Sequence, residues 1–175
     1  MSHQSCLLLA TLAMAEQEFR VYVSKDYLKF NAAHFIAYQG FREALHGHNY
    51  RVSVQVEGRL GVQGYVLDFG IVKDTARRVC KRLDEKTLIP ARSDCLTIRE
   101  DGTQVVVRYE SDEFRFPKSD VLLLPIVHTS AEELAQYVLG EIRRELAAGG
   151  ITGLDALEVG VAETTGQAAY CRERL

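Results

Sequence analysis

The sequence has few cysteines, little net charge and no long apolar run. Its four cysteines show no Cys-x-x-Cys spacing and no dense framework, so we expect reduced thiols in a cytoplasmic protein. The formal net charge is −3, which gives no reason to expect nucleic acid or an anionic membrane as a partner. There are no internal repeats and no low-complexity segments. These absences leave an ordinary globular domain.

An apolar run of ten residues, Cys6 to Ala15, lies near the beginning of the chain. It is too short to span a bilayer. It also lacks the basic start of a secretory signal and the arginines of a transit peptide. Met14 lies directly before the predicted domain. Residues 1–17 are therefore expected to be a disordered extension or an artefact of an upstream start.

The remaining residues, 18–175, are predicted to form one α+β domain. The length suffices for a single full core, and 47% apolar and 26% charged residues are ordinary for a globular protein. Hydrophobic periodicity predicts two helices, which begin after Asp68 and Ser130, and four main strands, at residues 18–31, 50–56, 156–163 and 167–172. That order suits one antiparallel sheet with two helices on one face.

A separate β-meander is predicted at about residues 92–118. Its three short strands cover residues 96–99, 105–109 and 114–116, with turn residues between them. Such a meander has the character of an insertion that elaborates the scaffold or an interface. We assign it no chemistry.

Three of the five histidines lie in one stretch of the chain. His34 lies just past the end of the first predicted strand, and His46 and His48 lead directly into the second. Residues two apart in a strand share a face, so His46 and His48 point the same way, and strand pairing can bring His34 alongside. Three imidazoles suit a catalytic Zn²⁺, which keeps a fourth position open. The spacing alone also fits ordinary strand histidines, and three imidazoles also accept Fe²⁺ or Co²⁺.

Five short motifs occur in a fixed order between Glu18 and the C-terminus. They are Phe30-Asn31-Ala32-Ala33-His34, His46-Gly47-His48-Asn49-Tyr50, Leu67-Asp68-Phe69, Thr129-Ser130-Ala131-Glu132 and Ala162-Glu163-Thr164. Together they resemble the 6-pyruvoyl-tetrahydropterin synthase / 6-carboxytetrahydropterin synthase family. The resemblance implies the tunnelling fold and a zinc-dependent pterin enzyme, with His34, His46 and His48 as the zinc ligands. It also implies a homo-oligomer, a hexamer, with active sites between subunits.

The same resemblance places four residues at the pterin pocket. Glu163 continues an apolar strand face after Val161, where a carboxylate is costly unless strong donors pair with it. A pterin ring offers an N–H beside an amino group, which suits a bidentate contact, and the resemblance makes Glu163 the pterin anchor. Thr129, Ser130 and Glu132 join it. Two alternatives stay open: Glu163 faces water at a strand end, and Glu132 only complements the helix dipole.

The base of the reaction is the point at which the sequence departs from most of the family. Members that make 6-pyruvoyl- or 6-carboxy-tetrahydropterin carry a cysteine shortly before His-Gly-His. No cysteine lies between Cys6 and Cys80, and Glu43 stands in that segment instead. The Glu-x-x-His-Gly-His pattern resembles the variant that replaces dihydroneopterin aldolase in folate synthesis and converts 7,8-dihydroneopterin triphosphate to 6-hydroxymethyl-7,8-dihydropterin. Glu43 is then the base of a retro-aldol cleavage; otherwise it is a solvated loop acid.

A second departure concerns an Asp-His pair that the family usually carries after its first helix. Asp84 is retained there and remains a catalytic candidate, but the histidine is absent. His128, just before the pocket motif, is the residue that could replace it.

The triphosphate of such a substrate needs positive charge or backbone donors. Arg42, beside Glu43, is the first candidate to bind it, with Lys25 and Lys29 behind it. Lysines on an exposed strand are also commonly solvated.

Three functions follow from these residues. The first is zinc-dependent cleavage of the dihydroneopterin triphosphate side chain, with Glu43 as base. The second is a 6-carboxy- or 6-pyruvoyl-tetrahydropterin synthase in which Glu43 stands in for the cysteine. The third is a catalytically inert pterin- or metal-binding paralogue, which the incomplete Asp-His pair motivates.

Overall fold

The computed structural model describes residues 17–175, so the predicted N-terminal extension lies outside the described residues except for Gln17. This part of the chain contains two helices, a short 3₁₀ turn and eleven strands. The helices are α1 (Phe69–Leu83) and α2 (Ala131–Ala148), and the 3₁₀ turn is Lys118–Asp120. The strands are β1 (Phe19–His34), β2 (Ala37–Tyr38), β3 (Phe41–Arg42), β4 (His46–Gly58), β5 (Lys86–Pro90), β6 (Thr97–Asp101), β7 (Gln104–Tyr109), β8 (Asp112–Pro117), β9 (Val121–Leu124), β10 (Leu154–Thr164) and β11 (Gln167–Arg174).

The main sheet has six strands in the order β11-β10-β4-β1-β5-β9. The four strands from β11 to β1 pair antiparallel, as predicted. β5 and β9 join in parallel, so the sheet is mixed, and the prediction of a wholly antiparallel sheet is corrected. The parallel pairing of β5 with β1 follows from contacts at the end of α1. Asp84 accepts hydrogen bonds from the backbone N–H and the side-chain amide of Asn31. The N–H of Glu85 donates to Asn31 O. β5 therefore starts beside the end of β1 and continues in the same direction.

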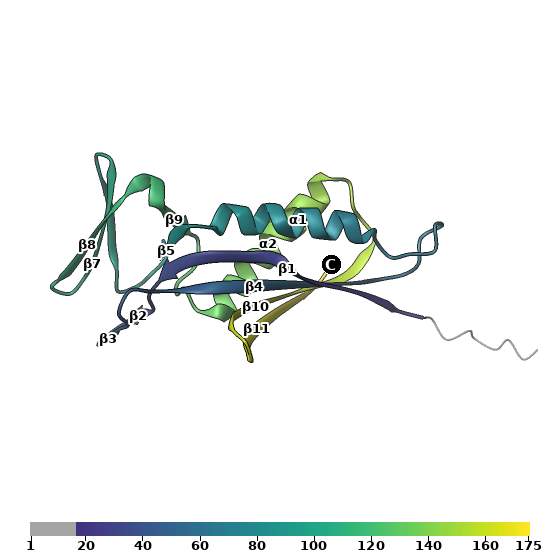
Figure 1. Ribbon diagram of the computed structural model, residues 1–175, viewed down its shortest axis with the longest axis horizontal. Helices are drawn as coiled ribbons and strands as arrows, with labels where there is room; N and C mark the ends of the chain where they lie inside the picture. The colour runs from purple at the N-terminus through teal and green to yellow at the C-terminus, as the bar shows by residue number, and fades with distance from the viewer. Residues whose placement is uncertain (1–16) are drawn as a thin grey trace, which may run out of the picture.

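Both helices lie on one face of the sheet (Figure 1), as the sequence predicts. Each helix begins at the predicted residue. The Asp68 carboxylate accepts a hydrogen bond from Gly70 N at 2.6 Å, and the Ser130 hydroxyl accepts one from Glu133 N at 3.3 Å. The apolar faces of the helices and the helix-facing side of β1, β4 and β10 form one core. This core fixes which side chains of the three strands point toward the helices.

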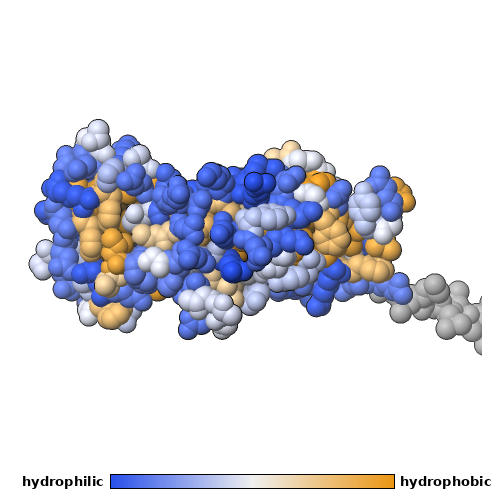
Figure 2. All heavy atoms as spheres, in the orientation of Figure 1, coloured by the Kyte–Doolittle hydropathy of each residue, from blue (hydrophilic) through white to orange (hydrophobic). Residues whose placement is uncertain are grey.

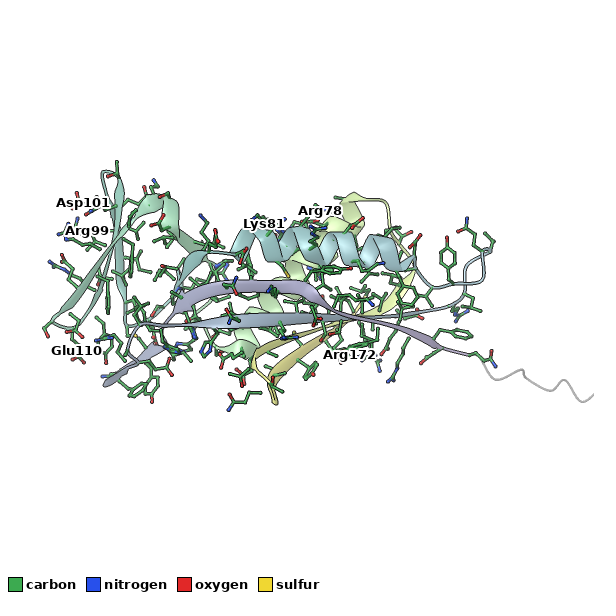
Figure 3. All side chains as sticks on the ribbon, in the orientation of Figure 1. Arg78, Lys81, Arg99, Asp101, Glu110 and Arg172 are labelled. Atoms are coloured by element: carbon green, nitrogen blue, oxygen red, sulfur yellow. The ribbon has the colours of Figure 1, made fainter. Side chains whose placement is uncertain are left out.

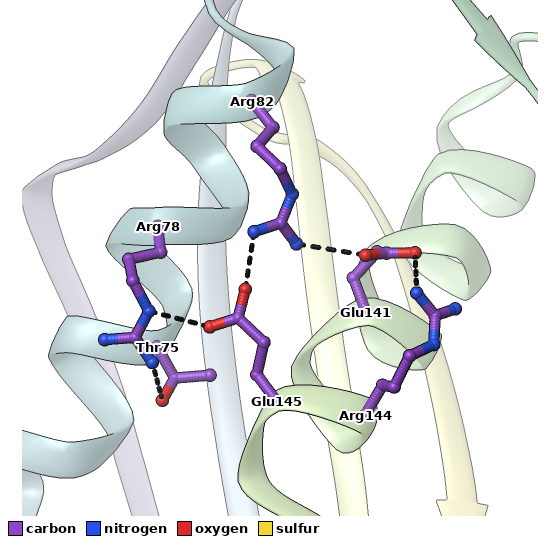
Figure 4. A network of polar contacts seen from close by, with 6 residues as sticks. All are labelled: Thr75, Arg78, Arg82, Glu141, Arg144 and Glu145. Atoms are coloured by element: carbon purple, nitrogen blue, oxygen red, sulfur yellow. Dashed lines mark hydrogen bonds and ion pairs between the residues drawn. The ribbon is translucent and has the colours of Figure 1, made fainter. Parts of the chain in front are cut away.

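The two helices are also joined by an ion network on their outer sides (Figure 4). Glu145 of α2 accepts from Arg78 at 2.8 Å and from Arg82 at 2.5 Å, both on α1. Glu141 accepts from Arg82 at 3.0 Å and from Arg144 at 2.6 Å. Burial opposes the charge on Glu145, but the hydrogen bonds from the two arginines lower its pKa overall. The network fixes α1 against α2 at the helix layer's surface.

The three predicted strands of the meander are present as β6, β7 and β8, and they form a sheet of their own. We call Thr97–Pro117 the meander. It lies at the far end of the molecule from the start of β1 (Figure 1), and Figure 3 shows its Arg99 and Asp101 there. A second, smaller core joins it to the segment after β1, through Phe35, Ala37, Ile89, Val105, Val107 and Tyr109.

The surface in the orientation of Figure 1 is largely hydrophilic over α1, with hydrophobic side chains gathered toward the two ends of the molecule (Figure 2). No helix among residues 17–175 combines the length and apolar character needed to cross a membrane.

Glu57, near the end of β4, ties three strands together. Its side chain is 9% exposed, accepts a hydrogen bond from Arg172 of β11 (labelled in Figure 3), and pairs with Arg20 of β1 at 3.2 Å. We expect Glu57→Gln to lower the free energy of unfolding by about 1–3 kcal/mol at neutral pH, because it weakens hydrogen bonds to a charged, shielded group. Urea denaturation of both proteins measures this difference.

The pH dependence of that difference has a defined sign. The hydrogen bond from Arg172 is the main cause that lowers the pKa of Glu57 in the folded chain. A carboxyl whose folded pKa is lowered contributes stability above its unfolded pKa and loses it as the pH falls through the folded pKa. The two proteins should therefore converge in stability in acid. A difference that stays constant from neutral pH through the acid range contradicts this account.

Candidate active site

The three predicted metal ligands meet at one end of the helix-facing side of the sheet. His34 is the last residue of β1 and pairs with His46, the first residue of β4, while His48 pairs with Ala32. Their ring centroids lie 4.6 to 5.1 Å apart. One ring nitrogen from each lies within 4.8 Å of the others. We call His34, His46 and His48 the triad.

Backbone carbonyls fix the orientation of two of these rings. His34 Nδ1 donates to Thr129 O at 2.9 Å, and His46 Nδ1 donates to Ala44 O at 2.8 Å. Each bond leaves Nε2 with a free lone pair, which is the arrangement that metal-ligating histidines adopt.

The buried Nε2 of His34 has no partner among the described residues. His34 is 1% exposed, and its Nε2 makes no hydrogen bond within residues 17–175. Burial, followed by the charge of His46, lowers the pKa of His34 to about 4, so the ring is neutral at neutral pH. A neutral imidazole with an unpaired buried nitrogen is costly without a partner and suits a metal ion. The donor set therefore fits Zn²⁺.

Glu43 is held next to the triad by the β2–β3 hairpin. The two strands pair Ala37 with Arg42, and the next residues continue the ladder: Glu43 N donates to Ile36 O at 2.9 Å. Ile36 N donates in turn to Glu43 Oε2 at 3.0 Å. This bond holds the carboxylate against the segment that directly follows His34, and the charge of Glu43 opposes the lowering of the pKa of His34. The structure thus brings the predicted base and the predicted ligands together.

Glu163 lies near the end of β10, the strand that pairs with β4. It lines a hollow of about 370 Å³ together with His48 and Arg51. The residue is of intermediate exposure, and its charge is one of the causes that raise the pKa of Tyr50.

Tyr50 is a site residue that the sequence interpretation missed. Its ring packs against His34 and His48, at centroid distances of 5.8 and 5.4 Å, and its hydroxyl is buried without a hydrogen-bond partner among the described residues. Burial, followed by the charges of Glu163 and Glu43, raises its pKa. The signal was present, because Tyr50 follows His48 by two residues on the same strand face.

The motif before α2 has a supporting role at the triad. Thr129 is fully buried, its carbonyl orients His34, and its hydroxyl donates to Phe35 O at 3.0 Å. Ser130 is the helix N-cap, and Glu132 is exposed in the first turn. Glu133, which the sequence pairs with Ser130 as a capping box, accepts from Val127 N at 2.7 Å and from His128 N at 3.1 Å and so holds this loop.

Two of the predicted site residues are engaged elsewhere. Asp84 bonds Asn31, on the opposite strand face from His34, and makes no contact with the triad within residues 17–175. Arg42 donates to Asp112 and to the backbone of Glu43, so its guanidinium is already committed. A contact between Arg42 and a triphosphate therefore stays a prediction, for a guanidinium that already has these partners.

The remaining candidates lie outside the triad as well. His128 Nδ1 is buried and unpaired, but this ring shares no ring contact or hydrogen bond with the three ligands among the described residues. Lys25 and Lys29 are exposed on β1.

Comparison with known proteins connects this geometry to one family. The family described as 6-pyruvoyl tetrahydropterin synthase matches residues 22–174. A protein of Methanocaldococcus jannaschii named putative 6-carboxy-5,6,7,8-tetrahydropterin synthase is 34% identical over 149 residues, which is 85% of this chain and 91% of that protein. A dihydroneopterin monophosphate aldolase of Pyrococcus furiosus is 41% identical over 59 residues, 34% of this chain and 50% of that protein.

Among solved structures, the fold resembles the 6-pyruvoyl tetrahydropterin synthase of Plasmodium vivax. The TM-score is 0.88 at 37% identity, over 91% of this chain and all of that one. Two further structures of the Plasmodium vivax protein replace a glutamate, described as a catalytic residue, by alanine or cysteine. From the match over residues 22–174, the chain belongs to the 6-pyruvoyl tetrahydropterin synthase family.

Proposed function

We propose that this protein is a zinc-dependent lyase that cleaves the side chain of 7,8-dihydroneopterin triphosphate to give 6-hydroxymethyl-7,8-dihydropterin for folate synthesis. The observation that carries the proposal is Glu43, which stands beside the triad where most of the family has a cysteine. Cys80 offers no substitute, because it lies in the core and burial raises the pKa of its thiol to about 12. The catalytic glutamate named for the Plasmodium vivax protein supports the same assignment.

In the proposed reaction, His34, His46 and His48 hold the metal. A zinc ion held there supplies positive charge that lowers the pKa of the side-chain hydroxyls of the substrate. The carbonyls of Thr129 and Ala44 keep two of the rings in the tautomer that leaves Nε2 free for it.

Glu43 performs the proton transfer. Its carboxylate removes the proton from the hydroxyl on the second side-chain carbon. The bond between the first and second side-chain carbons breaks, and the second carbon leaves as the aldehyde of a glycolaldehyde-type fragment that carries the triphosphate. The electron pair passes into the dihydropterin ring, and the first carbon then takes up a proton to become the hydroxymethyl group. Atoms and electrons balance without an oxidant or reductant.

Glu163 anchors the pterin in this proposal. Its carboxylate accepts from the ring N–H and the amino group as a charge-assisted pair. The hollow that it lines with His48 gives the ring a place next to the triad. Thr129, Ser130 and Glu132 remain proposed pocket residues, with Thr129 acting through His34.

Identification of the product tests the proposed function. The zinc-loaded protein is incubated with 7,8-dihydroneopterin triphosphate, and the products are separated and weighed. Hydroxymethyl-dihydropterin with a glycolaldehyde-type fragment is expected. The monophosphate is supplied in parallel, because a relative is named as a monophosphate aldolase. Release of free triphosphate with a pyruvoyl product rejects the proposal, and so does the absence of turnover in protein that holds zinc.

A second candidate function is a 6-carboxy- or 6-pyruvoyl-tetrahydropterin synthase. The names of the Methanocaldococcus jannaschii relative and of the Plasmodium vivax structure favour it. In this candidate Glu43 moves protons on carbon in place of the cysteine. The product analysis above distinguishes the two functions.

Replacing Glu163 tests the pterin anchor. We expect Glu163→Gln to raise KM about 10- to 100-fold, because the variant loses one charge-assisted hydrogen-bond acceptor. The matched control is Glu158→Gln, the same change on the same strand at a partly buried residue near the middle of β10. Steady-state kinetics of both variants give the result. An unchanged KM in Glu163→Gln contradicts the assignment.

We further propose a cytoplasmic homo-oligomer, a hexamer by resemblance to the family. β11 is the edge strand of the main sheet, and an edge strand offers unpaired backbone groups to another copy. The three cysteines among the described residues are free thiols, which fits a reducing compartment. Light scattering measures the mass as a multiple of the 19.6 kDa chain.

A further inference from the structure

We propose that the meander holds Glu43 in its working position through Asp112 and Arg42, which act as positioning residues for the base. The inference rests on the proposed function, because it concerns the residue assigned there as the base. From the sequence alone, the meander carries no chemistry and Arg42 is a candidate for the triphosphate. The contacts of Arg42 instead connect the meander to Glu43.

Arg42 joins the meander to the backbone of Glu43. Its Nε and Nη2 donate to Asp112 Oδ2 of β8 at 3.1 and 2.6 Å, and its Nη1 donates to Glu43 O at 2.7 Å. The guanidinium also lies over the ring of Phe114, 4.9 Å from the centroid. The Arg42 side chain is 21% exposed. These contacts use both sides of its planar fork, which a lysine could not do.

The rest of the hairpin that carries Glu43 also rests on the meander. Tyr109 of β7 donates its hydroxyl to Tyr38 O at 3.1 Å. Phe35, next to His34, stacks on Phe114 at a centroid distance of 5.1 Å. The smaller core continues this packing beneath Ala37. The meander is thus the platform on which β2 and β3 lie, while Glu43 follows β3 directly.

The hydrogen bonds around Glu43 leave one oxygen free. Its carbonyl is held by Arg42, its N–H by Ile36 O, and its Oε2 by Ile36 N. Oε1 makes no hydrogen bond within the part of the chain that the structure describes. The base therefore has a fixed backbone, one anchored carboxylate oxygen and one oxygen available to take a proton. A misplacement of about 1 Å can cost a reaction about 100-fold, so this restraint has kinetic weight.

Variants of the pair test the inference through kinetics. We expect Asp112→Ala and Arg42→Ala each to lower kcat about tenfold or more, with KM within about twofold of the parent value. Asp112→Glu should restore part of kcat, and Asp112→Ala should add little in an Arg42→Ala background, because both act through one chain of contacts. The matched control is Glu113→Gln at the neighbouring residue, whose ion pairs within residues 17–175 are with Arg108 and Arg115 of the meander. Its kcat should be unchanged.

The opposite kinetic pattern overturns the inference. If Arg42→Ala raises KM and leaves kcat constant, Arg42 binds the triphosphate of the substrate and does not position Glu43. If Asp112→Ala has the same kcat as Glu113→Gln, the meander does not position Glu43.

A second measurement separates this inference from the proposed function. Hydrogen exchange of the peptide that spans residues 35–45, followed by mass spectrometry, reports the Ile36 and Glu43 amides without any turnover. Faster exchange in Asp112→Ala than in Glu113→Gln supports positioning even if dihydroneopterin triphosphate is not the substrate. Equal exchange in the two variants overturns positioning even if the expected product forms.

Discussion

Glu43→Gln is expected to lower kcat about 10³-fold while the zinc content and KM stay close to those of the parent protein. Glutamine keeps the shape of the side chain, and its carbonyl can still accept from Ile36 N, but it cannot take up the hydroxyl proton. Loss of a general base typically costs between about 10² and 10⁴ in rate. Steady-state kinetics with a metal determination on the same sample give both quantities.

The control for this change is Glu100→Gln. Glu100 is an exposed acid of β6 whose partner is Lys118, and it lies outside the site. The substitution Glu100→Gln removes the same charge from the chain as Glu43→Gln does and should leave kcat unaltered. If Glu43→Gln turns over at the parent rate, Glu43 is not the base and the aldolase-type cleavage loses its support.

His46→Ala is expected to lower the affinity for zinc by more than about 100-fold and to abolish turnover. Loss of a partner that merely orients a ligand costs about 10- to 100-fold in metal affinity, so loss of a ligand itself should cost more. His46 is exposed at the start of β4, so the core remains intact without it. Chelation of the parent protein should have the same effect on turnover, reversed by added Zn²⁺, whereas added Zn²⁺ at the same concentration should not rescue the variant.

His128→Ala serves as the control for metal content. Its ring is partly buried like that of His48 but shares no contact with the triad among the described residues. Stoichiometric zinc is therefore expected in this variant. Stoichiometric, tightly held zinc in His46→Ala as well would remove this histidine from the ligand set.

Periodicity in the sequence predicted the parts of the fold in which one face of an element is buried. β1, β4, β10 and the two helices repeat apolar residues at strand or helical spacing, and the N-caps Asp68 and Ser130 mark both helix starts. The same alternation placed His46 and His48 on one face. Pairing of β1 with β4 then brings His34 alongside, as the sequence led us to expect.

The missed features depend on contacts between distant segments. β5 and β9 are only five and four residues long, and their parallel pairing follows from the docking of α1 at Asn31. The sequence shows that Arg42 is a cation next to Glu43, but it does not show that Arg42 donates to Asp112, which lies 70 residues away.

We expect the hydrogen bond from His34 to Thr129 to couple zinc binding by the triad to the order in which the chain folds. The triad comes from two strands joined by a short connection, so its nitrogens can gather soon after the first third of the chain leaves the ribosome. The carbonyl that orients His34 lies 95 residues further on. A nascent chain therefore has the three triad histidines before the bond that orients His34 can form, and we expect it to bind zinc more weakly until the second helix docks. Retention of the ion in a competition with chelator thus reports whether the second half of the molecule has reached its native arrangement.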